Sequence, residues 1–221
     1  MVEGLKNLPL PRISIFRDKI DEDYFPYMNA LATDSSVDLK SYDIPSNVDI
    51  LDINDCEDVV KGFHQVLKNV QYGNKVLIAG DSAGGAICTT LAIRAMTDKS
   101  LKIDKQILIY PSVDYTSSMP SVEENGTGFL LEKTRIQWYF DNYFDDYEDR
   151  AEMSPLVGPF DATMPGSLVV IAGCDPLRDE GLEYAKKLRL AGVNVEVREF
   201  ENMIHAFMNI EDLVSEECRE L

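Results

Sequence analysis

The sequence contains few of the residues that build metal or redox sites. It has two histidines and four cysteines in 221 residues, and no two cysteines form a CxxC pair. A zinc site or a dithiol redox motif needs clustered ligands, so neither is expected. Nucleotide motifs are missing as well, because "GDSAGG" has neither the Lys-Ser/Thr of a P-loop nor G-x-G-x-x-G spacing. No metal or other cofactor is implied, and a reducing, cytoplasmic location is expected.

Long hydrophobic runs and positive charge are also scarce. No apolar run approaches 18 residues, and "MVEGLKNLPLPRISIF" lacks the charged-then-apolar pattern of a secretory signal, so no membrane span is expected. The 21 Lys and Arg residues against 39 Asp and Glu residues give a formal net charge of −18. This charge disfavours nucleic acids and anionic membrane surfaces as partners, because both are polyanions. Solubility is a sufficient explanation for the acidity.

From about residue 54 onward, strand-like and helix-like segments alternate. Strands that alternate with helices form right-handed crossovers, which predict a mainly parallel sheet. The expected fold class is therefore α/β, with helices on both faces of the sheet. Apolar, β-rich runs predict strands over 75–80, 105–110, 167–173 and 194–200. Helical spacing predicts helices over 55–69, 82–96, 132–144 and 179–191, and a final helix from about residue 210.

The length suits one globular domain, so a single domain is expected over 1–221. Residues 112–130 are rich in Ser, Pro and Gly and predict a loop. The helix predicted over 132–144 belongs to an insertion, 112–150, that lies over something apolar. Its apolar face is expected to consist of Ile136, Tyr139, Phe140, Tyr143 and Phe144.

The stretch Gly80-Asp81-Ser82-Ala83-Gly84 fits the pattern G-x-S-x-G between a predicted strand and a predicted helix. In such an elbow the serine occupies a sharp turn, where side chains two residues to either side would collide with neighbouring backbone. The start of the following helix offers free N–H groups to a developing oxyanion. The alternative is a tight turn with a capping serine.

A nucleophilic serine needs a base, and the base needs an orienting carboxylate. The two histidines differ in their predicted positions. His64 falls in the middle of the helix predicted over 55–69. His205 follows a strand and a short polar turn, "ENMIH", which is the position that a base requires. The alternative is that His205 is a surface histidine.

The orienting carboxylate should follow the preceding strand, and "VVIAGCDPLRDEG" supplies two acidic candidates. Asp175 comes first, and Pro176 favours an extended conformation there. Asp179 better suits the N-cap of the next helix. Because the carboxyl ends of parallel strands meet at one edge of a sheet, Asp175 is expected to lie near Ser82 and His205.

The motifs "GDSAGG", "YP", "SPL", "AGCDPLRDEGLEYAKKLRLAG" and "MIHAF" resemble the hormone-sensitive-lipase-like group of α/β-hydrolases over about 54–212. This group includes bacterial carboxylesterases and arylacetamide-deacetylase-type enzymes. The resemblance implies a serine carboxylesterase or deacetylase that acts on short or medium acyl esters, with small-molecule esters as partners. It also implies that 112–150 flanks the acyl pocket.

The resemblance implies a role for each residue that matches the family motifs. Ser82 would be the nucleophile, Asp175 the orienting acid and His205 the base. The backbone N–H of Ala83 would be an oxyanion donor. The elbow itself would be shaped by Gly80, Asp81 and Gly84.

The sequence departs from the family in lacking the HGG or HGGG loop that supplies further oxyanion donors. Relative to the family, the fold would also be N-terminally abbreviated, with 1–50 as a shortened N-terminal part. Three interpretations stay open: an active enzyme with other donors recruited from 1–50, a weak or inactive small-molecule binder of the same fold, or a truncated isoform. An exposed sheet edge would favour a homodimer. The sequence does not name the ester.

Overall fold

The computed structural model describes residues 75–220, which all fall within one compact unit of the chain, Asp52–Leu221. The helix predicted over 55–69 and His64 lie outside the described residues. The single domain expected over 1–221 stays a prediction.

The described residues build a sheet of four parallel strands in the order β1-β2-β3-β4. The register aligns Asp81 with Ile109 and Ile109 with Val170, so the strand ends lie side by side at the carboxyl edge. The strands are β1 (Leu77–Asp81), β2 (Lys105–Ile109), β3 (Gly166–Cys174) and β4 (Val195–Ile204).

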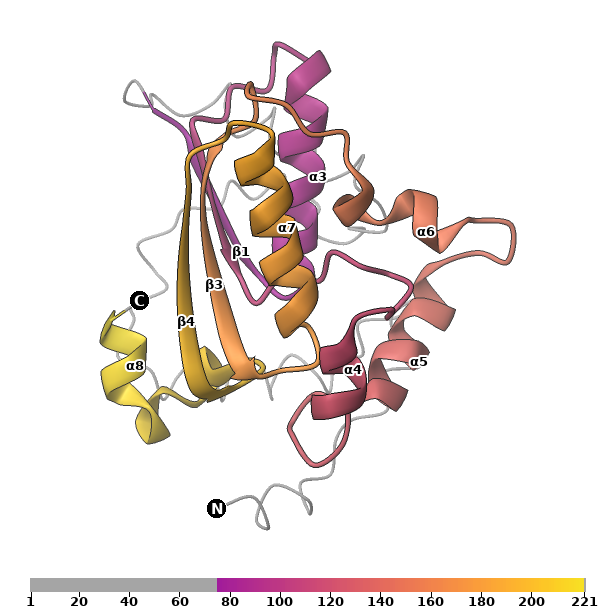
Figure 1. The fold of residues 1–221 in the computed structure, drawn as a ribbon, viewed down its shortest axis with the longest axis vertical. Helices are drawn as coiled ribbons and strands as arrows, with labels where there is room; N and C mark the ends of the chain where they lie inside the picture. Colours follow the sequence, from indigo (N-terminus) through magenta and orange to yellow (C-terminus); the bar gives the residue numbers. More distant parts are fainter. Residues whose placement is uncertain (1–74, 221) are drawn as a thin grey trace, which may run out of the picture. The chain divides into compact units, whose positions relative to one another are not determined.

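Two crossover helices, α3 (Ala83–Thr97) and α7 (Arg178–Leu190), pack on the same face of this sheet (Figure 1). Successive strands are neighbours in one direction, so right-handed crossovers place both helices on that face. Each helix turns one apolar stripe, spaced three or four residues apart, toward the strands. The core on this face contains Ile78, Leu108, Val169 and Ile171 from the sheet, Cys88, Leu91 and Ala92 from α3, and Tyr184, Ala185 and Leu188 from α7.

Helix α7 ends where the sequence predicts, at a glycine in the left-handed region. Gly192 has φ 88° and its N–H donates to the carbonyl of Arg189 at 3.0 Å. The N–H of Val193 donates to the carbonyl of Leu188, also at 3.0 Å. These two bonds form a Schellman motif, which stops the helix and turns the chain into β4.

The opposite face of the sheet is covered by η4 (Phe207–Leu213) and α8 (Ser215–Glu220). The single helix predicted from about residue 210 is therefore wrong in detail. Ile210 has non-helical dihedrals, and the chain forms a 3₁₀ segment followed by a short α-helix. Because helices cover both faces of a parallel sheet, the expected fold class is confirmed.

The segment 112–150 contains more structure than the sequence predicts. A short helix, α4 (Pro120–Asn125), lies inside the predicted loop, and α5 (Lys133–Tyr143) matches the predicted helix. Helix α5 buries Ile136 and Phe140, but the side chain of Tyr143 is 55% exposed, so its predicted place on the apolar face is wrong. The stripe runs at four-residue spacing from Ile136 through Phe140 to Phe144. Two further short elements follow, α6 (Arg150–Met153) and η3 (Pro155–Val157).

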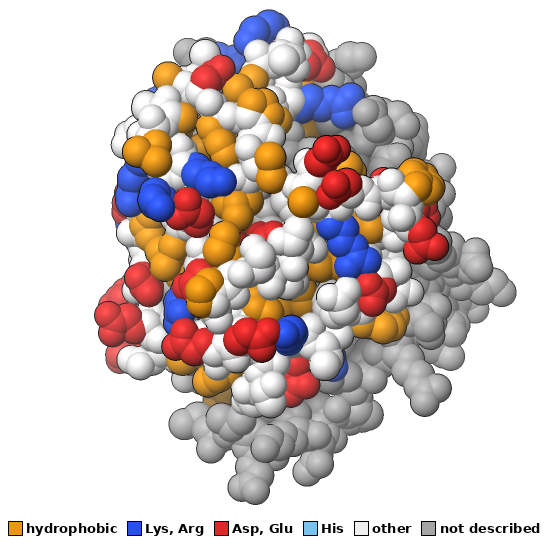
Figure 2. Space-filling view, turned by 45° about the vertical axis from the view of Figure 1, so that its right-hand side comes forward, with side chains coloured by type: hydrophobic (Ala, Val, Ile, Leu, Met, Phe, Trp, Pro, Cys, Tyr) orange, Lys and Arg blue, Asp and Glu red, His pale blue; other side chains and the backbone are white. Residues whose placement is uncertain are grey.

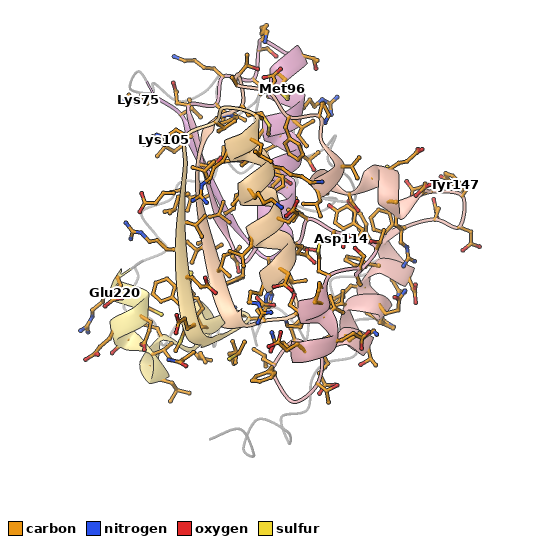
Figure 3. The ribbon with its side chains drawn as sticks, in the orientation of Figure 1. Lys75, Met96, Lys105, Asp114, Tyr147 and Glu220 are labelled. Atoms are coloured by element: carbon orange, nitrogen blue, oxygen red, sulfur yellow. The ribbon has the colours of Figure 1, made fainter. Side chains whose placement is uncertain are left out.

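The carboxyl ends of the strands point toward α4 (Figures 1 and 3). In Figure 3, Lys75, two residues before β1, and Lys105, the first residue of β2, lie at the same end of the sheet. On the face shown in Figure 2, acidic and basic side chains are interspersed with hydrophobic ones. Across residues 75–220, no helix combines the length and the apolar character that crossing a membrane requires.

Candidate active site

Ser82 lies in a strained turn between β1, which ends at Asp81, and α3, which begins at Ala83. Its φ of 52° and ψ of −117° fall in a region that L-residues adopt at a cost of about 1–3 kcal/mol. The surrounding backbone holds the turn. The Ser82 N–H donates to the carbonyl of Ile109 at 2.9 Å, and the Ser82 carbonyl accepts from the N–H of Ser112 at 3.2 Å. The turn is therefore fixed by β2 and by the chain that follows it.

Close backbone contacts explain two glycines of the elbow. A Cβ atom on Gly80 would lie 2.2 Å from the carbonyl oxygen of Gly84, so the steric reason expected for Gly80 is confirmed. The same reason is wrong for Gly84, where a Cβ atom would meet Asp81 Oδ1 at an ordinary 3.8 Å. Gly85 is the second position that has no room for a side chain. A Cβ atom there would lie 2.7 Å from the Cβ atom of Pro111. The elbow needs glycine where α3 approaches β1 and the end of β2.

The structure brings the three candidate catalytic side chains together. His205 Nε2 lies 2.9 Å from Ser82 Oγ, and His205 Nδ1 lies 2.7 Å from Asp175 Oδ2. A carboxylate only accepts hydrogen bonds, so Nδ1 carries the proton and Nε2 accepts from the serine hydroxyl. The exposed fraction is 6% for His205 and 0% for Asp175, so little water competes for these bonds.

His205 reaches this position because β4 is longer than the sequence indicates. The predicted strand ends at residue 200 and is followed by a polar turn, but β4 runs to Ile204 and no such turn is present there. His205 follows the strand directly, and Ala206, at φ 60°, turns the chain away. The chain therefore reaches His205 through an irregular end of β4, where the register against β3 shifts between Phe200 and Ile204.

Asp175 is oriented by its own turn. Its Oδ1 atom accepts the N–H of Leu177 at 2.8 Å, which leaves Oδ2 for His205. The register between β3 and β4 shifts between Ala172 and Cys174, and such an irregularity re-aims the residues that follow it. Between them, Gly173 lies so close to β4 that a Cβ atom would be 2.1 Å from the carbonyl oxygen of Glu201.

Asp179 does not cap α7, so its predicted role is wrong. The N-cap is Leu177, and Asp179 lies in the first turn of the helix. Its Oδ2 atom accepts the N–H of Ser121 in α4 at 2.9 Å. Asp179, whose position in the sequence suits an N-cap, therefore makes a tertiary contact to α4 instead.

Tyr110, the residue that follows β2, packs against the imidazole of His205. Its ring centroid lies 4.8 Å from that of His205, and its side chain is buried. Burial raises the pKa of Tyr110, and the negative charges of Asp81 and Asp175 raise it further. The phenol therefore stays neutral. The sequence motif "YP" marks this position but does not reveal the contact.

Glu180 is a buried carboxyl group that sequence reasoning missed. Its Oε1 atom accepts the N–H groups of Val113 at 2.7 Å and Asp114 at 3.1 Å. Burial raises the pKa of Glu180 well above its ordinary value. Because Ser112 touches the serine turn, Glu180 links α7 to the loop beside Ser82. An acidic residue in the first turn of a helix gives no sign of such burial.

This arrangement has the parts of a nucleophilic serine site. Ser82 and Ala83 lie at the start of α3, where backbone N–H groups lack intrahelical acceptors and favour negative charge. Within residues 75–220, no cluster of three or more His, Cys, Asp or Glu side chains is able to hold a metal ion.

Known proteins share this sequence pattern and fold. The α/β hydrolase fold family matches residues 51–209. The chain is 34% identical over 145 residues to an ethyl acetate hydrolase of Pseudomonas putida, covering 64% of this chain and 46% of the relative. It is 37% identical over 143 residues to the carboxylic ester hydrolase LipN of Mycobacterium tuberculosis, covering 62% and 38%.

The chain is also similar to solved structures of esterases. A hyperthermophilic esterase from the archaeon Pyrobaculum calidifontis superposes with a TM-score of 0.68 at 30% identity, covering 75% of this chain and 56% of the esterase. The chain thus spans about half the length of the proteins it matches, or less.

The elbow contacts predict that two neighbouring glycines differ in their tolerance of alanine. Gly80→Ala should destabilise the protein strongly, because its Cβ atom would press on the backbone of Gly84. Gly84→Ala is the matched control and should fold with almost unchanged stability. Thermal unfolding of both variants measures the difference. Equal stability of the two would contradict the contact at Gly80.

The buried carboxyl group predicts a pH-dependent stability. Since the pKa of Glu180 is raised in the folded state, the unfolded chain loses this proton first as pH rises from about 4.5, and stability falls. Glu180→Gln keeps a carbonyl acceptor and removes this pH-dependent loss of stability, which is at most roughly 1.4 kcal/mol per pH unit. Denaturant unfolding between pH 5 and 7 should show that the free energy of unfolding of Glu180→Gln rises relative to that of the wild type as the pH increases.

Glu183→Gln, on the partly exposed side of the same helix, is the control and should show no such trend. A stability difference between Glu180→Gln and the wild type that stays constant with pH would mean that Glu180 is not held protonated.

Proposed function

This chain belongs to the α/β-hydrolase family, and we propose that it is a serine carboxylesterase. One observation carries the proposal: Ser82 Oγ, the His205 imidazole and the Asp175 carboxylate form a continuous hydrogen-bonded series at 2.9 Å and 2.7 Å. A serine hydroxyl becomes a useful nucleophile when a base removes its proton, and the base is effective when a carboxylate holds it.

In the first half of the reaction, Ser82 Oγ attacks the ester carbonyl carbon while His205 Nε2 takes the hydroxyl proton. The tetrahedral intermediate collapses, and the bond to the alcohol oxygen breaks. His205 returns its proton to that oxygen, so the alcohol leaves and the acyl group stays on Ser82. Asp175 stabilises the imidazolium that forms in between and keeps its proton on Nδ1.

In the second half, a water molecule replaces the alcohol. His205 Nε2 takes a proton from the water as it attacks the acyl-serine carbonyl. Collapse of this second intermediate releases the carboxylic acid and returns the proton to Ser82 Oγ. The enzyme is then unchanged, and no cofactor is required for the balance.

The backbone N–H of Ala83 is the first hydrogen-bond donor that stabilises the oxyanion. Ala83 occupies the first position of α3, where an N–H group has no acceptor within the helix. The HGG loop that donates further bonds in the family is not found in this sequence. One missing donor lowers kcat by about 10²–10³-fold, so we expect a modest turnover unless other backbone donors contribute.

Short or medium acyl esters are the proposed substrates, and the named activity of the Pseudomonas putida relative toward ethyl acetate supports the shorter end of this range.

We also propose a cytoplasmic location and a homodimer for this chain. Among the described strands, β1 pairs only with β2, and an edge strand that lacks a second partner favours association between chains.

The proposal predicts hydrolysis of p-nitrophenyl acetate that depends on Ser82. Ser82→Ala should lower the rate about 10³-fold or more, because the acyl-enzyme cannot form. Ser100→Ala, in an exposed turn beyond α3, is the matched control and should keep the wild-type rate. Release of p-nitrophenol measured at equal protein concentration decides the outcome. Equal rates for Ser82→Ala and the wild type would refute the proposed nucleophile, and binding without turnover would favour the small-molecule binder.

A further inference from the structure

Helix α4 supplies hydrogen-bond donors to the turn that carries Asp175. The Nδ2 atom of Asn125 donates to the carbonyls of Asp175 at 3.2 Å and Gly173 at 3.4 Å. The hydroxyl of Ser121 donates to the carbonyl of Pro176 at 2.7 Å. Carbonyls on both sides of the Asp175 side chain are thus held by one short helix, far from the turn in sequence.

A reciprocal pair of bonds locks α4 against the start of α7. The N–H of Ser121 donates to Asp179 Oδ2 at 2.9 Å, and the N–H of Asp179 donates to Ser121 Oγ at 3.1 Å. Arg178 adds an ion pair to Glu124 of α4 at 2.7 Å. Ser121 and Asn125 are both buried, so losing one of their bonds leaves a carbonyl group without access to water.

These bonds act just beyond the end of β3, after an irregular stretch of the sheet. The register of β3 against β4 shifts between Ala172 and Cys174, pairing resumes at Cys174, and Asp175 is the first residue past the strand. The direction of the carboxylate then depends on the conformation of the turn from 173 to 176. A displacement of about 1 Å in a catalytic group costs roughly 10²-fold in rate, which makes the support of this turn important.

We propose that Asn125, assisted by Ser121, is a positioning residue that aims the Asp175 carboxylate at His205 by holding the backbone carbonyls around it. Asn125 touches neither the serine nor the imidazole in any bond described above, so it acts through Asp175 alone. The inference rests on the proposed function. It also gives helix α4 a role in catalysis.

Steady-state kinetics with p-nitrophenyl acetate tests the role of Asn125. Asn125→Leu removes the donors without adding charge, and we expect kcat to fall by about 10–100-fold with KM changed less than about threefold. Asn142→Leu is the matched control, because Asn142 also donates to a backbone carbonyl, that of Trp138, but on the exposed side of α5. Its kcat should equal that of the wild type.

Proton NMR gives a second readout that does not need turnover. The proton shared by His205 Nδ1 and Asp175 gives a strongly downfield resonance, which should weaken or shift in Asn125→Leu and in Ser121→Ala but not in Asn142→Leu. A merely structural role would lower stability and leave this resonance in place. If Asn125→Leu does not fold, Ser121→Ala decides, with the same expected shift and a smaller fall in kcat.

The outcomes separate the two proposals. Wild-type kcat together with an unchanged resonance in folded Asn125→Leu and Ser121→Ala overturns the positioning role and leaves the esterase intact. Absence of turnover in the wild type refutes the esterase function. In that case the proton resonance alone tests the positioning role of Asn125. Absence of the resonance from the wild type itself overturns the positioning role.

Discussion

The hydrogen bond of 2.7 Å between His205 Nδ1 and the Asp175 carboxylate is the interaction on which the rest of the site depends. It fixes the proton on Nδ1, and it thereby leaves Nε2 free to accept from Ser82. Each surrounding feature serves this one bond. β4 extends to Ile204 and delivers the imidazole, Tyr110 packs against its ring, and the second oxygen of Asp175 is occupied by the N–H of Leu177. Burial of both partners keeps water from competing.

The parallel sheet provides the geometry in which this bond forms. Three side chains follow the ends of β1, β3 and β4, and the register brings those ends to one edge. Ser82 meets the imidazole from a strained elbow. Its N–H donates to the carbonyl of Ile109 and its carbonyl accepts from the N–H of Ser112, and these bonds hold the turn. The buried Glu180 carboxyl group and helix α4 then tie the loops after β2 and β3 to α7. The loops of the site are thus anchored to the scaffold from several sides.

The sequence predicts those parts of this arrangement that local patterns encode. The strands, the crossover helices, the stop at Gly192 and the positions of Ser82, Asp175 and His205 follow from hydrophobic period, turn residues and motif order. Contacts between distant segments leave no such pattern. Asn125 reads as one polar residue in a loop, Glu180 reads as a solvated helix residue, and Asp179 has the composition of a cap. The roles of these three side chains become visible only when α4 and α7 are placed together.

Labelling with a fluorophosphonate tests most directly whether the imidazole activates the serine, because the probe reacts with an activated hydroxyl and needs no complete turnover. Peptide mapping of the labelled wild type should find a single adduct on the peptide that contains Ser82, and His205→Ala should lose it. Labelling of Ser82 at an unchanged rate in His205→Ala, or no adduct in the folded wild type, would contradict the account.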